Sequence, residues 1–254
     1  MSTLIARHQH IISKLMKEGT IKVVDLCNEL NVSSVTIRKD LKFLEDKELL
    51  YRNHGGGTLG NPYTADRPVN EKANIQSVQK LHIGEAAAGL IEPNDCILIA
   101  SGTTVLSFAK HLHPKGHLTV ITAALNVALE LSHHPDIEVI QLGGILRKSS
   151  SSVTGAYAEK ILADFSCSKL FLGVDGIDVD FGLTTTNMME AQLNRSMIQA
   201  SQKTIVLADS TKFGKRGFGK ICGLEDVEQI ITDSKISDHM AATLKGMGIE
   251  ITIV

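Results

Sequence analysis

Short apolar runs typical of β-strands recur along the last two thirds of the chain. They lie at residues 96–100, 118–122, 137–142, 169–174, 204–208, 228–232 and 249–254. Segments with apolar residues at helical spacing separate most of these runs, at 79–90, 104–112, 155–164, 188–200 and 238–246. Such alternation is typical of a largely parallel sheet covered by helices. We therefore predict an α/β fold for this part of the chain.

The first 48 residues instead show the pattern of three short helices. Apolar side chains repeat at helical spacing in the first two, at Ile12, Leu15 and Met16 and then at Val23, Leu26, Cys27 and Leu30. The sequence Asn31-Val32-Ser33 predicts a tight break, with Ser33 or Ser34 as N-cap of the third helix. Three glycines at 55–57 then predict the turn of a short hairpin.

A junction separates these two parts. Residues 61–68 follow neither pattern and include Pro62, Tyr63 and Pro68. A length of 254 residues fits two domains. We predict a winged helix-turn-helix domain over residues 1–60, a linker over 61–75 and an α/β domain over 76–254.

Composition excludes several classes of protein. The chain has no run of 18 apolar residues, so we expect a cytoplasmic protein with no membrane partner. Aromatic residues make up 4% and Trp is absent, which is too few for stacking single-stranded nucleic acid. Cys27, Cys96, Cys167 and Cys222 are far apart and form no CxxC motif. We therefore expect no disulfide, no metal site and no other cofactor.

Segment 22–48 has the length of a helix-turn-helix, whose second helix packs one face inward and offers the other to the DNA major groove. On a helical wheel, Val35, Lys39 and Lys42 lie opposite Ile37, Leu41 and Leu44, with Thr36 and Arg38 between. Residues 1–60 carry nine Lys and Arg against seven Asp and Glu, whereas the other 194 residues carry 17 against 21. This asymmetry has the sign expected of N-terminal DNA binding. A solvated basic face on an ordinary three-helix bundle is the alternative.

The DNA-binding hypothesis assigns roles to the outward side chains. Arg38 or Lys39 contacts a guanine edge or a phosphate, and Thr36 or Val35 contacts a thymine methyl group. Side chains of the hairpin approach a phosphate or the minor groove. The candidate DNA-binding residues are Ser33, Ser34, Val35, Thr36, Arg38, Lys39, Lys42, Arg52 and His54.

Two runs in this part resemble a known family. They are Ser33-Ser34-Val35-Thr36-Ile37-Arg38-Lys39-Asp40-Leu41, followed by Leu44, and Leu49-Leu50-Tyr51-Arg52-Asn53-His54-Gly55-Gly56-Gly57. Together they resemble the signature of the DeoR family of sugar-catabolism regulators, in which a TIRRDL recognition helix leads into an L-x-R-x-HGG wing. The resemblance implies a repressor whose winged helix occupies the major groove of double-stranded operator DNA.

Polar loops follow several predicted strands of the α/β part. Ser101-Gly102-Thr103-Thr104 ends the first strand and opens a helix, where small residues, hydroxyl groups and free N–H groups favour an anion. A helix-capping turn without a ligand is the alternative. Since open α/β sheets bind ligands at the carboxyl ends of their strands, we predict one effector site there. Its candidate residues are Ser101, Gly102, Thr103, Thr104, Gly143, Gly144, Arg147, Asp175, Gly176, Thr185 and Lys212.

These stretches also resemble the DeoR-type sensor domain, which is similar in fold to ribose-5-phosphate isomerase. The resemblance covers about residues 4–254. It implies a phosphorylated sugar effector, with its phosphate on Ser101 to Thr104 and Lys212 nearby. Two positions depart from the family pattern: Ala100 replaces an acid in D-x-G-T-T, and Ala123 replaces the Asn of T-N-S-L. We therefore expect the effector or its mode of binding to differ from that of typical members.

A sugar-phosphate isomerase using Asp175 and Asp178 is the alternative function. Isomerisation needs a base and a group that stabilises the enediolate. The isomerase family supplies these from K-G-G-G and R-E-K motifs, whereas residues 182–197 here contain no lysine and only one acid, Glu190. We therefore expect no catalytic residue and no enzyme activity.

The favoured hypothesis is a repressor of a carbohydrate-catabolism operon that a small sugar phosphate releases from its operator. Helix-turn-helix regulators read two half-sites as symmetric assemblies, so we expect a homodimer or homotetramer.

Overall fold

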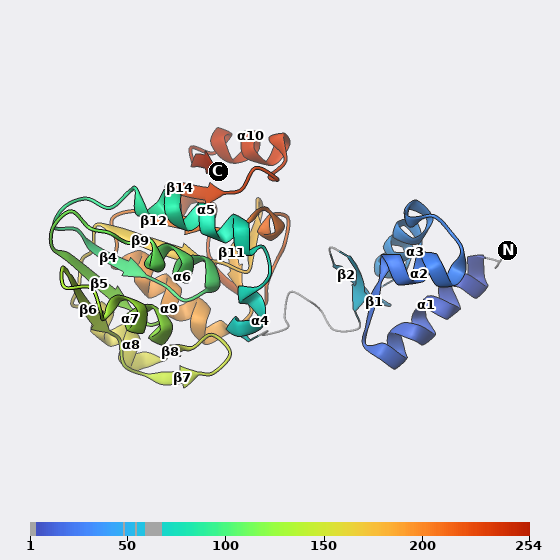
Figure 1. The fold of residues 1–254 in the computed structure, drawn as a ribbon, viewed down its shortest axis with the longest axis horizontal. Coiled ribbons are helices and arrows are strands. Elements are labelled where there is room, and N and C mark those ends of the chain that lie inside the picture. Colours follow the sequence, from blue (N-terminus) through green and yellow to red (C-terminus); the bar gives the residue numbers. More distant parts are fainter. Residues whose placement is uncertain (1–3, 48, 54, 59–67) are drawn as a thin grey trace. The chain divides into compact units, whose positions relative to one another are not determined.

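The computed structural model describes residues 4–47, 49–53, 55–58 and 68–254 (Figure 1). The chain divides into two compact units, Met1–Ala65 and Asp66–Val254. We call them the N-terminal unit and the C-terminal unit and describe each by itself. No helix among the described residues is long and apolar enough to span a membrane.

The N-terminal unit is a winged helix-turn-helix, as predicted. Its helices are α1 (Leu4–Glu18), α2 (Val23–Leu30) and α3 (Ser34–Asp46). Its strands are β1 (Thr20–Lys22), β2 (Tyr51–Asn53) and β3 (Gly56–Thr58), which pair antiparallel in the order β1-β3-β2. Asn31 adopts the left-handed conformation that ends α2, in the predicted break. Strand β1 was not predicted, because three residues carry too short a pattern.

One apolar core joins these elements. Its fully buried members come from all three helices and from β1 and the start of the wing: Ile11, Leu15, Ile21, Leu26, Ile37, Leu41, Leu44 and Leu50. The inward face predicted for the third helix is thus buried.

A seven-stranded parallel sheet forms the centre of the C-terminal unit. Its strands are β4 (Cys96–Ile99), β5 (Leu118–Thr122), β6 (Ile137–Gln141), β9 (Lys169–Gly173), β12 (Thr204–Leu207), β14 (Gln229–Thr232) and β15 (Glu250–Ile253). Their spatial order is β15-β14-β12-β9-β4-β5-β6. Each of the seven predicted apolar runs forms one of these strands, which confirms the α/β fold class.

Helices cover both faces of this sheet (Figure 1). They are α4 (Val69–Ala73), α5 (Ser77–Ala88), α6 (Thr103–Lys110), α7 (Leu125–Leu131), α8 (Ala156–Leu162), α9 (Met188–Gln199) and α10 (Asp238–Gly246). Strand β4 shows the layering, because Ile97 and Ile99 pack in the core of α5, α6 and α7. Leu98 and Ala100 pack in the core of α8, α9 and α10 on the opposite face. Side chains that alternate along the strand therefore fill two cores.

Short elements between the strands and helices complete the unit. They are the hairpin of β7 (Ile145–Arg147) and β8 (Ser152–Thr154), a small sheet of β10 (Gly176–Asp178), β11 (Gly182–Thr185) and β13 (Gly219–Cys222), and the 3-10 turns η1 (Ser210–Lys212) and η2 (Leu224–Asp226).

The predicted linker, residues 61–75, contains ordered structure at its end. Residues 61–67 lie outside the described residues. Residues Val69–Ala73 form α4, which packs against α6 in the C-terminal unit. A short helix with Pro68 as its N-cap escaped the prediction, because prolines were interpreted as marks of a loop.

Candidate functional site

The outward face of α3 carries the predicted DNA-binding side chains. Ser33 caps the helix, since its Oγ accepts a hydrogen bond from Thr36 N at 3.2 Å. Ser34, Val35, Arg38, Lys39 and Lys42 are exposed, and Thr36 is half-buried. Donors and a methyl-bearing surface thus share one face, as a recognition helix requires.

The wing is tied to this helix by Arg52. Its backbone N–H donates to Glu45 Oε1 at 2.9 Å, and its Nη1 lies 3.7 Å from Glu45 Oε2. Arg52 is half-buried, so part of its guanidinium group is accessible. His54 lies outside the described residues.

Asp40, on the inward side of α3, was not predicted to have a special role. It is buried and accepts hydrogen bonds from Arg7 Nη2 at 2.9 Å and from His8 Nε2 at 3.0 Å. Burial alone would raise the pKa of Asp40, but these hydrogen bonds outweigh burial and hold it below the ordinary value. The hydrogen bonds from Arg7 and His8 to Asp40 therefore hold α1 against α3.

A polar cleft opens where β4, β9 and β12 end. It encloses about 750 Å³ of space not filled by protein atoms, its open mouth included. Ser101, Gly102, Thr103 and Thr104 line one wall at the start of α6. Gly102 has φ +134°, a conformation nearly restricted to glycine, which allows the sharp turn from strand into helix. The first N–H groups of α6 have no partner within the helix, so this turn offers donors to an anion.

The structure brings most of the predicted effector residues into this cleft. Those that line it are Ser101, Gly102, Thr103, Thr104, Asp175, Thr185 and Lys212. Arg147 lies behind the lining and pairs with Glu190, which does line it.

Three predicted glycines are not among the lining residues. Gly144 and Gly176 serve close packing instead: a Cβ would stand 2.6 Å from Thr154 O and 2.4 Å from Lys215 O, respectively. Gly143 has open space around its Cα. The glycine doublet after β6 is therefore a turn outside the cleft.

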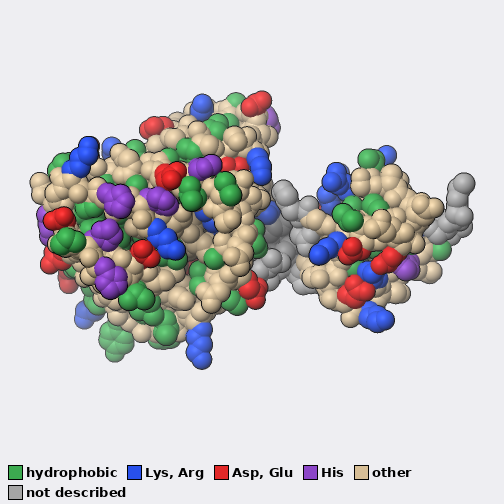
Figure 2. Space-filling model, in the orientation of Figure 1, with side chains coloured by type: hydrophobic (Ala, Val, Ile, Leu, Met, Phe, Trp, Pro, Cys, Tyr) green, Lys and Arg blue, Asp and Glu red, His purple; other side chains and the backbone are tan. Residues whose placement is uncertain are grey.

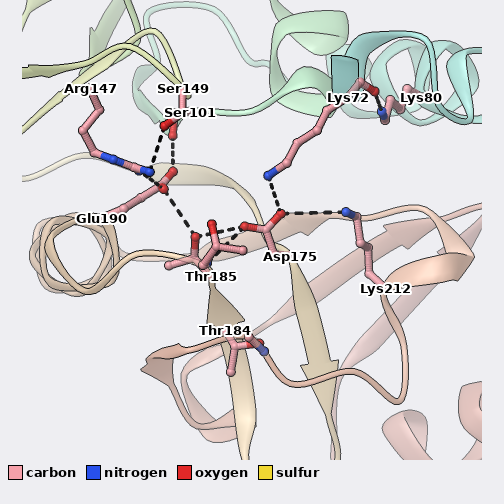
Figure 3. Close-up of polar contacts among 12 residues, drawn as sticks. Lys72, Lys80, Ser101, Arg147, Ser149, Asp175, Thr184, Thr185, Glu190 and Lys212 are labelled. Atoms are coloured by element: carbon pink, nitrogen blue, oxygen red, sulfur yellow. Dashed lines mark hydrogen bonds and ion pairs between the residues drawn. The ribbon is translucent and has the colours of Figure 1, made fainter. Parts of the chain in front are cut away.

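One side of the cleft is organised by Glu190 (Figure 3). Its Oε1 accepts a hydrogen bond from Ser101 Oγ at 2.6 Å, and its Oε2 pairs with Arg147 and accepts from Thr185 Oγ1 at 3.3 Å. Arg147 Nη2 also donates to Ser149 Oγ at 3.1 Å. The Glu190 carboxylate thus links the loop that contains Ser101, the β7–β8 hairpin and α9.

The other side carries two lysines around Asp175. Lys72 Nζ lies 2.8 Å and Lys212 Nζ 3.9 Å from Asp175 Oδ1. Thr185 Oγ1 donates to Asp175 Oδ2 at 3.1 Å. Burial alone would raise the pKa of Asp175, but the charges of Lys72 and Lys212 outweigh it and hold the pKa below its ordinary value. Two cations therefore share one carboxylate at the cleft wall.

Lys80 lies under Lys72 and is only 6% exposed. Its Nζ donates to the carbonyl oxygens of Lys72 and Ile75, both at 2.6 Å, and so closes the end of α4. Burial lowers the pKa of Lys80 to about 8. The negative charge of Asp209 opposes this shift, and the positive charges of Lys212 and Lys72 add to it.

Several cleft residues were not among the predicted effector residues. They are Val69, Lys72, Ile75, Lys80, Ser149, Ser150, Gly173, Val174, Glu190, Asp209 and Thr211. Asp209 and Thr211 stand in the same polar loop as Lys212, and that position was a usable signal. Lys72 and Lys80 precede β4, the first strand of the main sheet. A search limited to residues that follow strands therefore does not find them.

Ala100 and Ala123 are buried in the apolar core and do not line the cleft. The expectation that the effector or its mode of binding differs from that of typical members stays a prediction.

The carboxylates of the isomerase alternative are not in one site. Asp175 lines the cleft, whereas Asp178 lies outside it and pairs with Arg216 Nη2 at 2.8 Å. Asp178 Oδ1 also accepts from Phe181 N at 2.9 Å, which holds the turn between β10 and β11.

A winged helix-turn-helix joined to an α/β unit with a polar cleft at its strand ends is the architecture of a DNA-binding regulator of transcription. The chain matches the "DeoR-like helix-turn-helix domain" over residues 7–62 and the "DeoR C terminal sensor domain" over residues 75–234. It belongs to the DeoR family of transcriptional regulators.

Relatives of similar length support this membership. The chain is 35% identical to the uncharacterised HTH-type transcriptional regulator YulB of Bacillus subtilis, over 98% of this chain and 96% of the relative. It is 34% identical to a protein of Escherichia coli O157:H7 provisionally named the aga operon transcriptional repressor, over 98% and 93%. Ribose 5-phosphate isomerase A of Methanocaldococcus jannaschii is a structural neighbour at 14% identity and TM-score 0.38, over 53% of each chain. At that similarity the neighbour carries no argument about the site.

Proposed function

We propose that this regulator represses a carbohydrate-catabolism operon and leaves its operator when a small sugar phosphate binds the cleft. The observation that carries the proposal is the meeting of Lys72, Lys212 and the first turn of α6 in one cleft. Lysine ammonium groups and the free N–H groups of a helix start are the usual donors to phosphate. The name of the relative associated with the aga operon agrees with repression.

Acceptors beside these donors suit the hydroxyl groups of a sugar. Asp175, Glu190 and Asp209 line the same cleft, and carboxylates accept hydrogen bonds from hydroxyl groups. A ligand with one anionic end and several hydroxyl groups matches this distribution.

The division of labour follows the two units. We propose residues 1–60 as the DNA-binding domain, 61–75 as the connection and 76–254 as the sensor, in a homodimer or homotetramer that presents paired recognition helices. The effector must prefer the weakly DNA-binding arrangement by its whole coupling free energy, about 1–3 kcal/mol.

Thermal unfolding of the full chain with a panel of sugar phosphates, the matching free sugars and inorganic phosphate tests the cleft. A ligand of the native state raises the unfolding temperature. We expect a sugar phosphate to do so more than its free sugar, and to release a DNA duplex selected by the protein from a random pool.

Thr103→Glu places a carboxylate in the phosphate loop and is expected to abolish both effects while leaving DNA binding intact. Thr243→Glu on α10 adds the same charge away from the cleft and is the control. If the sugar phosphate still releases the Thr103→Glu variant fully from the DNA duplex, the effector site is not at this loop.

A further inference from the structure

Eight large apolar side chains are exposed on the β7–β8 hairpin and on the three helices that contact it in the C-terminal unit. They are Leu125, Leu129, Ile145, Leu146, Tyr157, Ile161, Met188 and Met189, which we call the apolar face. They belong to α7, β7, α8 and the start of α9. Figure 2 shows hydrophobic side chains gathered along the lower edge of this unit, where Figure 1 places α7, α8 and β7.

Contacts between these elements make the face continuous. A Cβ on Gly155, at the start of α8, would lie 3.8 Å from both Ile145 Cδ1 and Met189 Cε, so these two side chains flank Gly155. Leu125 N donates to Ser151 O at 2.9 Å, which joins α7 to the β7–β8 hairpin. Leu125 and Leu129 share one side of α7, and Tyr157 and Ile161 one side of α8, because each pair is four residues apart.

The exposure is large for a protein that stays alone in water. Between 38% and 78% of each of these residues is accessible, with Tyr157 at the upper end. This amounts to on the order of 700 Å², above the roughly 300–600 Å² of the largest apolar patch on a typical monomer. It is close to the roughly 800 Å² that each partner of a standard interface buries.

The charged residues around the apolar face are compatible with its pairing with the same face of a second copy of the chain. Lys148 and Lys160 are exposed and Glu130 and Glu159 partly exposed at its rim. In an isologous interface each residue meets the same patch of the other subunit, so charges of both signs on one patch can pair across it. The polar rim of a membrane-binding face is instead typically rich in Lys and Arg.

We propose that the apolar face is the surface through which two copies of this chain associate. The inference rests on the proposed function, because paired recognition helices require two copies of the chain. The size of the apolar face and the charges at its rim indicate where the two copies meet.

The same elements reach the cleft on their other side. Ser149 and Ser150, in the turn of the β7–β8 hairpin, and Glu190, in the first turn of α9, all line it. Arg147 of β7 pairs with Glu190 directly behind the face. An effector that contacts Glu190 or Ser149 therefore contacts the elements that build the interface.

Sedimentation velocity of the full chain over a concentration series tests the proposal. The wild-type protein is expected to self-associate, and Leu129→Glu and Tyr157→Glu are each expected to weaken association at least tenfold, since burying an unpaired charge is unfavourable. Both side chains are exposed in the single chain, so its unfolding temperature should change little. Tyr157→Ser, which removes the ring without adding charge, is a second variant with the same expected direction. Met247→Glu, on an exposed residue that ends α10, is the control and should associate like the wild type.

A wild-type chain that stays monomeric throughout would overturn the proposal and leave the face to a different protein or a lipid surface. Unchanged association of both glutamate variants would overturn it as well and place the contact elsewhere. These results are separable from the proposed function. A sugar phosphate should still raise the unfolding temperature of Leu129→Glu, because the cleft of this variant is intact. If no sugar phosphate raises the unfolding temperature of the wild type, the proposed effector is wrong and the proposed interface is unaffected.

Discussion

Lys72 Nζ lies 2.8 Å from Asp175 Oδ1, which ties the first helix of the C-terminal unit to the loop that follows β9 (Figure 3). Lys212 approaches the same oxygen at 3.9 Å. The Asp175 carboxylate thus interacts with the same two lysine ammonium groups that would bind an anionic effector. An effector phosphate must share these lysines with Asp175 or replace it, and either event acts on α4.

Asp175→Asn is therefore expected to strengthen the binding of inorganic phosphate, by about tenfold, because it removes a negative charge next to the two lysines. Isothermal titration of the full chain with phosphate measures this. Asp178→Asn removes the same charge from the Arg216 pair outside the cleft and should leave the affinity unchanged. Weaker phosphate binding by Asp175→Asn would show that these lysines need the carboxylate to hold their positions.

Arg38→Ala is expected to cost about 1–3 kcal/mol of operator binding if Arg38 reads a base. Arg38 is exposed on α3 beside the capped first turn. Fluorescence anisotropy with a duplex selected by the wild-type protein, at fixed salt, measures the loss. Lys17→Ala removes an exposed charge from the last turn of α1 and is the control. Equal affinity of Arg38→Ala and wild type would remove this residue from the DNA interface.

The inner strands of the main sheet were predictable because they are buried on both faces and are therefore short apolar runs. The edge strands β6 and β15 are partly exposed, and their apolar residues still marked them as strands. The short hairpins were not predictable, because strands of three or four residues such as β7 and β10 are held by pairing and tight glycine packing rather than by a periodic apolar pattern. Helix α7 was missed because its seven residues directly follow β5 and Ala123-Ala124, and so continue an apolar stretch without a polar break.

The cleft was predictable where its residues follow strands of the sheet, as Ser101 and Lys212 do. Lys72, Lys80 and Glu190 enter it from helices, and their approach depends on how α4, α5 and α9 pack. No local pattern reports that packing. The exposed face of α3 was predictable from helical spacing alone, whereas the partner of Asp40 is 33 residues away in α1.

Asp40→Ala is expected to destabilise the N-terminal unit by about 3 kcal/mol, because it leaves the partly buried Arg7 without its carboxylate. Urea unfolding followed by circular dichroism measures the change. Asp25→Ala, in the exposed first turn of α2, should cost no more than about 0.5 kcal/mol.

The contribution of Asp40 also depends on pH in a definite direction. Its pKa in the folded chain lies below the ordinary value of 3.8, so folding favours the ionised form. The stabilisation is complete above the unfolded pKa and is lost as the pH falls through the folded pKa. The stability difference between wild type and Asp40→Ala should therefore shrink only in strongly acidic solution. A difference that stays constant down to the folded pKa and below would mean that the Arg7 pair does not act through the charge.

Lys80 gives a dependence of the same direction in alkaline solution, because its pKa is also lowered in the folded chain. Burial lowers its pKa from 10.5 to about 8, so the folded chain releases this proton more readily than the unfolded chain does. Between about pH 8 and 10.5 the unfolded state binds more protons, and stability therefore rises with pH over this window. Below pH 8 both states are protonated and the unfavourable contribution is constant. In Lys80→Met this titration is absent, so the wild type should gain up to about 3 kcal/mol relative to the variant across the window. Comparing the two proteins cancels the titration of other groups, and Lys203→Met, a substitution of another lysine outside the cleft, is the control. Parallel stability curves for wild type and Lys80→Met from pH 7 to 10.5 would show that Lys80 keeps an ordinary pKa and that water reaches its ammonium group under α4.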